Sequence, residues 1–155
     1  MEPSNKQIAN TVNERSYGLD VVDNKKLYNK ATAYINRVCS EYDLLAGDTR
    51  IFVVLQPDLQ WVSDKKNTGL DVNAACGSFC DSEDNFTAFV IYLSEKQFRK
   101  MGWQSYALSI RHELAHVEAN LRYGREIRDG DMEFELVCQW LDAPVTALDH
   151  EGLLQ

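Results

Sequence analysis

The chain has 155 residues, 45% of them hydrophobic and 26% charged, which is typical of one soluble globular domain and excludes a disordered or fibrous chain. Its formal net charge is -8 at pH 7. Lys and Arg side chains provide most of the affinity of proteins for nucleic acids, so this charge argues against a DNA-binding surface. We expect any contact with DNA to be indirect or through a partner.

The N-terminal part of the sequence, residues 1–20, is polar and shows no hydrophobic periodicity. It is therefore predicted to be a mobile segment that precedes a single domain, residues 21–155. No stretch resembles a secretion signal or reaches the length of a membrane span. We accordingly expect a cytoplasmic, intracellular protein that does not bind membranes.

Residues 24–45 are predicted to form an amphipathic helix, because apolar side chains recur there at spacings of three and four. Three strands are predicted to follow, at 51–55, 74–80 and 86–93, where β-branched and aromatic residues lie between turn residues. A turn at 81–85 is expected to join the last two strands.

A short helix is predicted after the third strand. Ser94 and Gln97 have the spacing of a capping box, in which the serine accepts a hydrogen bond from the backbone and the glutamine side chain reaches back. Gly102 is expected to end this helix, because glycine interrupts helical structure.

Two longer helices are predicted in the C-terminal third, at 104–123 before Gly124 and at 132–142 before Pro144. The order of elements is a helix, several strands and then further helices. This order favours an α+β fold in which a small, mostly antiparallel sheet packs on helices.

Four cysteines occur in the chain, Cys39, Cys76, Cys80 and Cys138, and only Cys76 and Cys80 are close in sequence. A Cys-x-x-x-Cys pair without a second pair is half of a zinc knuckle at best. We therefore interpret the cysteines as reduced thiols and metal binding by Cys76 and Cys80 as the less favoured alternative.

The long helix predicted at 104–123 contains the pattern H-E-x-x-H, from His112 through Glu113 to His116. Residues four apart lie on one helix face, so both imidazoles can bind one catalytic Zn²⁺ ion. Glu113 lies about 100° round the helix from His112, where it can deprotonate a water molecule at the open position of the ion. The alternative is a solvent-facing group of polar residues, but two of only three histidines in the chain occur here.

A catalytic zinc site needs a third protein ligand. The remaining histidine, His150, is near the C-terminus and is expected to be exposed, so a carboxylate is predicted. Asp129 and Asp131 precede the last helix, and Glu133 and Glu135 lie in it. The spacing does not choose among them, and an aspartate before a helix can also be its cap.

Four features follow one another from the long helix onward: His112-Glu113-Leu114-Ala115-His116, Tyr123-Gly124, Asp129-Gly130 with Phe134 soon after, and Trp140-Leu141-Asp142-Ala143-Pro144. Together they resemble the SprT-like (Spartan-related) metalloprotease domain over residues 86–144. The resemblance implies a zincin-like fold, His112 and His116 as zinc ligands, and Glu113 as the catalytic base. It also implies protein substrates, often associated with or crosslinked to DNA. The third ligand of the family is a histidine, whereas this chain has Asp129 there, or Asp131 in a different alignment.

The sequence therefore predicts a zinc-dependent endopeptidase that acts on proteins. One alternative is a repressor-cleaving peptidase of the ImmA type, with Glu133 or Glu135 as the third ligand. The other is a non-catalytic metal-binding interaction domain, although a structural site would need no base such as Glu113. Arg111 and Tyr123 are candidates for the group that stabilises the oxyanion.

Overall fold

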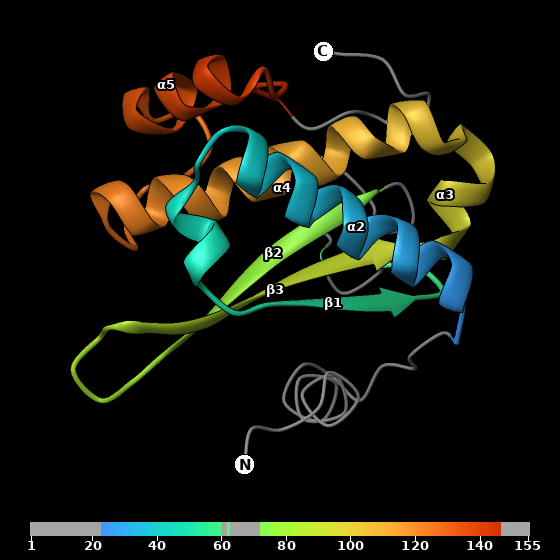
Figure 1. Ribbon diagram of the computed structural model, residues 1–155, viewed down its shortest axis with the longest axis horizontal. Coiled ribbons are helices and arrows are strands. Elements are labelled where there is room, and N and C mark those ends of the chain that lie inside the picture. Colours follow the sequence, from blue (N-terminus) through green and yellow to red (C-terminus); the bar gives the residue numbers. More distant parts are fainter. Residues whose placement is uncertain (1–22, 60–61, 63–71, 147–155) are drawn as a thin grey trace.

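The structure is a computed structural model that describes residues 23–59, 62 and 72–146 (Figure 1). The segment 1–20, predicted to be mobile, and His150, predicted to be exposed, lie outside the described residues. The elements follow in the order α2 (Lys25–Glu41), a 3-10 helix η1 (Leu45–Asp48), β1 (Ile51–Gln56), β2 (Ala74–Cys80), β3 (Phe86–Ser94), α3 (Glu95–Met101), α4 (Trp103–Tyr123) and α5 (Met132–Leu141). This is the α+β class that the sequence predicts.

The sheet has the strand order β1-β3-β2. β2 and β3 are antiparallel, because the turn at 81–85 connects them directly. β1 and β3 are parallel, with Ile51 opposite Phe89 and Gln56 opposite Ser94. The prediction of a mostly antiparallel sheet is therefore wrong, and the sheet is mixed. The chain between β1 and β3, which includes β2, provides the crossover that a parallel pair requires.

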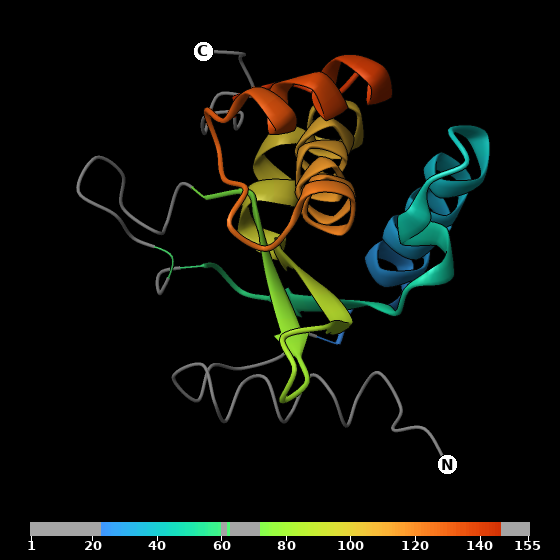
Figure 2. The same ribbon diagram turned by 90° about the vertical axis from the view of Figure 1, so that its left-hand side faces the viewer.

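The main core lies between the helices and one face of the sheet. Side chains alternate along β1, so that Val53 and Leu55 face the helices whereas Phe52 and Val54 join a smaller apolar cluster on the other face. Figure 2 shows α4 above the sheet, α2 beside it and α5 stacked on the side of α4 that is away from the sheet. None of the helices in the described ranges is long and apolar enough to cross a membrane.

Two predicted helix details are corrected by the structure. α2 ends at Glu41 rather than at residue 45, because the chain turns at Asp43 with a φ of 53° and enters η1. At the start of α3, Ser94 accepts a hydrogen bond from the backbone N–H of Gln97, as predicted. The Gln97 side chain, however, donates to Asn73 instead of reaching back.

Helix α4 begins directly after Gly102, whose φ of 80° allows the chain to turn sharply from α3. It ends at Tyr123 and is followed by the C-cap residue Gly124, which has a φ of 116°. The buried carboxylate of Glu118 accepts hydrogen bonds from the backbone N–H groups of Leu45 and Ala46 at 3.1 and 2.9 Å. These bonds join η1 to α4 and help to fix the helix that carries the candidate site.

Candidate metal centre

His112, Glu113 and His116 lie near the middle of α4. His112 is 1% exposed and Glu113 is 7% exposed, and His116 is partly buried. Burial of three ionisable side chains on one helix is costly unless they bind one another or an ion. The interpretation of this group as solvent-facing polar residues is therefore wrong.

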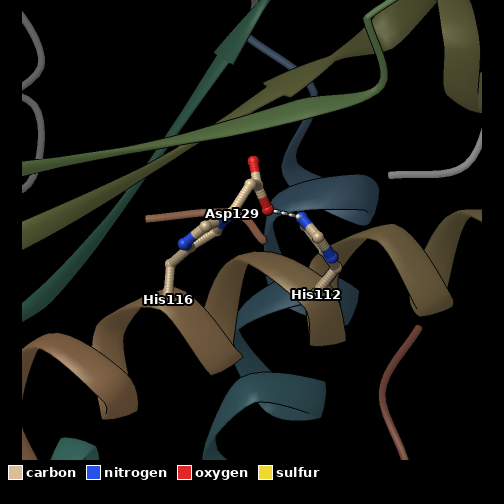
Figure 3. Close-up of side chains that lie close together, drawn as sticks. All are labelled: His112, His116 and Asp129. Carbon is tan, nitrogen blue, oxygen red and sulfur yellow. Dashed lines mark ion pairs between the residues drawn. The ribbon is translucent and has the colours of Figure 1, made fainter. Parts of the chain in front are cut away.

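Asp129 comes from the connection between α4 and α5 and lies next to both histidines (Figure 3). Its Oδ1 atom is 3.3 Å from the Nε2 of His112 and 3.1 Å from the Nε2 of His116. One nitrogen from each histidine and one carboxylate oxygen thus lie within 4.8 Å of one another, as ligands of a single metal ion would. The side chain of Asp129 is 66% exposed, so the group has access to solvent.

The loop that carries Asp129 is held at both ends by side-chain hydrogen bonds. Asn120, in the last turn of α4, donates to the carbonyl oxygens of Gly124 at 2.9 Å and Ile127 at 3.1 Å. At the other end, the carboxylate of Asp131 accepts from the backbone N–H of Arg128 at 2.8 Å. These contacts on either side fix the position of Asp129.

The other predicted carboxylates are not part of this group. Asp131 occupies the N-cap position of α5, but its side chain accepts from the loop rather than from the helix. Glu133 is partly buried and Glu135 is exposed. Within residues 23–59, 62 and 72–146, the metal-type group consists of the two histidines and Asp129 alone.

The second ring nitrogen of His112 contacts the chain that follows α5. Its Nδ1 is 2.8 Å from the backbone carbonyl oxygen of Pro144, which is buried. Because a carbonyl oxygen can only accept, Nδ1 must carry the hydrogen. When the imidazole loses its second proton to bind a metal, its lone pair is therefore on Nε2, the atom that faces Asp129. The sequence does not reveal this contact, since a backbone carbonyl group is present at every residue.

The charges of Asp129 and Glu113 favour the binding of a proton or a metal ion between His112 and Asp129. Burial lowers the pKa of His112, but its bond to Asp129 and the nearby charge of Glu113 outweigh this effect and raise the pKa to about 9. Burial raises the pKa of Asp129, but the hydrogen bonds from His112 and His116 lower it well below its usual range. In the metal-free protein a proton therefore lies between His112 and Asp129. A metal ion would replace this proton.

Glu113 lies beside the group without belonging to it, with its Oε2 4.0 Å from the Nε2 of His112. Burial raises the pKa of its carboxyl group, and the charges of His112 and His116 only partly offset this effect. Burial, and then the charge of Glu113, also raise the pKa of the Cys76 thiol on β2. A buried carboxylate with a raised pKa is suited to accept and return a proton.

The structure does not support the roles considered for Arg111 and Tyr123 in oxyanion binding or for the cysteines in metal binding. The guanidinium of Arg111 points to α2 and to the end of α5, where it donates to the hydroxyls of Tyr34 and Tyr42 and to the carbonyl oxygen of Leu141. It is therefore a residue that joins three helices rather than an oxyanion donor. Tyr123 is exposed at the last position of α4. All four cysteines are free thiols, and none belongs to a metal-type group among the described residues.

Comparison of the chain with known proteins gives no match to a family model, to a curated protein or to a solved structure. The resemblance to the SprT-like domain thus stays a hypothesis. The metal-type group rests on the geometry of the three side chains themselves.

Proposed function

We propose that this protein is a zinc-dependent endopeptidase of the SprT-like type, with a zincin-like arrangement of α4 beside the sheet. One observation carries the proposal: the Nε2 atoms of His112 and His116 and the Oδ1 of Asp129 converge, with the buried Glu113 next to them. Two nitrogens and one oxygen are the ligands of many catalytic zinc sites, which leave a fourth position open.

The ligand types support zinc as the ion, because zinc binds imidazole nitrogens and carboxylate oxygens. Bonds of about 2.0–2.2 Å at tetrahedral angles separate neighbouring zinc ligands by about 3.3–3.6 Å. The two nitrogen–oxygen distances to Asp129, 3.3 and 3.1 Å, are hydrogen-bond distances in the metal-free protein and would change little when zinc binds. Mg²⁺ and Ca²⁺ prefer ligand sets made of oxygen atoms, which this group does not provide.

The chemistry proposed is the addition of water to a peptide bond. A zinc ion in the group would acidify water and polarise the substrate carbonyl. Glu113 takes a proton from the attacking water as its oxygen bonds to the carbonyl carbon. It then returns the proton to the nitrogen of the leaving amine as the carbon–nitrogen bond breaks. The buried position of Glu113 and its raised pKa suit both steps.

Proteins are the proposed substrates, and substrates associated with or crosslinked to DNA follow from the SprT-like resemblance. The net charge of -8 favours recruitment of such substrates through a partner rather than by direct binding to DNA. The proposal therefore includes cleavage of a protein substrate without a requirement for DNA.

The test is cleavage of casein and of a protein crosslinked to DNA by the zinc-loaded protein and by Glu113→Gln. This substitution removes the base but keeps the size of the side chain and the three metal ligands. We expect cleavage by the wild type, inhibition by a chelator, and a loss of at least about 100-fold in rate in the variant. Bound zinc without cleavage of either substrate would instead favour a non-catalytic interaction domain.

A further inference from the structure

The side chain of Phe134, on α5, lies against both histidines of the metal-type group. We infer that Phe134 is a positioning residue, which holds the imidazole of His116 in the orientation that metal binding requires. This inference rests on the proposed zinc site. It concerns a residue that touches neither the ion nor a substrate.

The three rings form an ordered cluster. The ring of Phe134 stacks on that of His116, with centroids 4.2 Å apart and an interplanar angle of 17°. The same ring meets that of His112 edge-on, at 5.3 Å and 79°. The two imidazoles are nearly perpendicular to each other, at 85°. This arrangement directs both Nε2 atoms to the single Oδ1 of Asp129.

The two histidines are held in different ways. His112 is fixed through its Nδ1 by the carbonyl oxygen of Pro144. In the described part of the chain, His116 has no corresponding hydrogen bond from its Nδ1. Histidine ligands of metals usually have such a bond, which fixes the ring orientation. At His116 the face of Phe134 takes this role, because rotation of the imidazole would break the stack.

The ring of Phe134 is held in place by the packing of α5. Phe134 is 0% exposed and shares the buried face of α5 with Val137, Cys138 and Leu141. Asp129 is only five residues earlier in the chain, in the loop that leads into α5. Residues 129–134 thus provide both the third ligand, Asp129, and the ring that supports His116. The positions of these two ligands are therefore coupled.

The test compares Phe134→Leu with Leu141→Ala by metal affinity and stability, measured separately. Leu141 is equally buried on the same helix face but has no ring that could stack on an imidazole. Leu141→Ala removes more buried volume than Phe134→Leu does, so it should lower the midpoint of urea unfolding at least as much. We expect a loss of zinc affinity of about 10-fold or more in Phe134→Leu and less than about threefold in Leu141→Ala.

Cobalt provides an independent readout. The visible absorption of Co²⁺ in the site depends on ligand orientation, so Phe134→Leu should shift or broaden the bands, whereas Leu141→Ala should leave them unchanged. Phe134→Tyr keeps an aromatic ring at this position and should have the wild-type spectrum. If Phe134→Leu does not fold, Phe134→Met gives the same comparison.

The outcomes separate this inference from the proposed function. Wild-type affinity and an unchanged cobalt spectrum in Phe134→Leu would overturn the positioning role alone. If the zinc affinity falls in proportion to the stability in both Phe134→Leu and Leu141→Ala, the positioning role is also overturned. Absence of zinc binding by the wild type would contradict the proposed function itself.

Discussion

The Nδ1 of His112 lies 2.8 Å from the carbonyl oxygen of Pro144, which connects the metal-type group on α4 to the chain that follows α5. This contact requires a hydrogen on Nδ1 and leaves Nε2 for the metal. We therefore predict that nitrogen-15 NMR of the zinc-loaded protein shows His112 as the Nδ1–H tautomer. Its imidazole proton should exchange slowly, because Pro144 is buried. Zinc on Nδ1 of this ring would contradict the assignment.

Asn120 should control the loop that carries Asp129. Its side chain donates to two carbonyl oxygens of that loop, those of Gly124 and Ile127. Asn120→Ala is expected to lower the free energy of unfolding by about 1–2 kcal/mol and to weaken zinc binding. Urea unfolding and competition with a chelator measure the two effects. The exposed Asn36→Ala on α2 is the control, and equal effects of both variants would contradict the role of Asn120.

Glu118 is expected to be among the most sensitive positions of α4 outside the metal group. Its side chain is fully buried and accepts from Leu45, from Ala46 and from Arg122, the last at 2.6 Å. Glu118→Gln loses the charge that strengthens these bonds, so we expect a loss of about 2–3 kcal/mol in unfolding free energy. The exposed Glu41→Gln should have little effect. A similar urea midpoint for the two variants would refute the prediction.

Two buried thiols should make the fold sensitive to alkaline pH. Burial, and then the charge of Glu118, raise the pKa of Cys39 to about 11, and burial, and then the charge of Asp129, raise that of Cys138 to about 12. Above pH 9 the unfolded chain loses these protons while the folded chain keeps them. Stability that is fully present below pH 9 is thus lost as the pH rises toward 11 and 12.

The measurement is urea unfolding of the wild type and of Cys39→Ala at pH 8 and pH 10.5. Each thiol contributes a slope of at most about 1.4 kcal/mol per pH unit within its window. The variant should therefore lose less stability than the wild type between the two pH values. An equal loss would show that the Cys39 thiol does not contribute.

The sequence predicted the parts of the site that depend on local spacing. His112 and His116 share a helix face because they are four residues apart, and a carboxylate ligand followed from the scarcity of histidines. Both Asp129 and Asp131 were candidates, because the shape of a loop is not encoded by spacing. The choice depends on hydrogen bonds such as that between Asp131 and Arg128, which become visible only in three dimensions.

The predictions that failed concern contacts between distant segments. The parallel pairing of β1 with β3 depends on the path of the chain between them, which residue type does not specify. Gln97 has the spacing of a capping box, but a hydrogen bond to Asn73 from another element replaces the local one. The stacking of Phe134 on His116 was not predicted at all, since it depends on how α5 packs on α4.

The most direct test of the central claim is the zinc content of the wild type, Asp129→Ala and Glu135→Ala, measured by native mass spectrometry after zinc loading and desalting. We predict one zinc ion per chain in the wild type and in Glu135→Ala, and none in Asp129→Ala, because Asp129 is the proposed third ligand. Zinc retained in Asp129→Ala but lost in Glu135→Ala would contradict this site and favour the ImmA-type ligand set. A wild type that binds no zinc would contradict the proposed function as a whole.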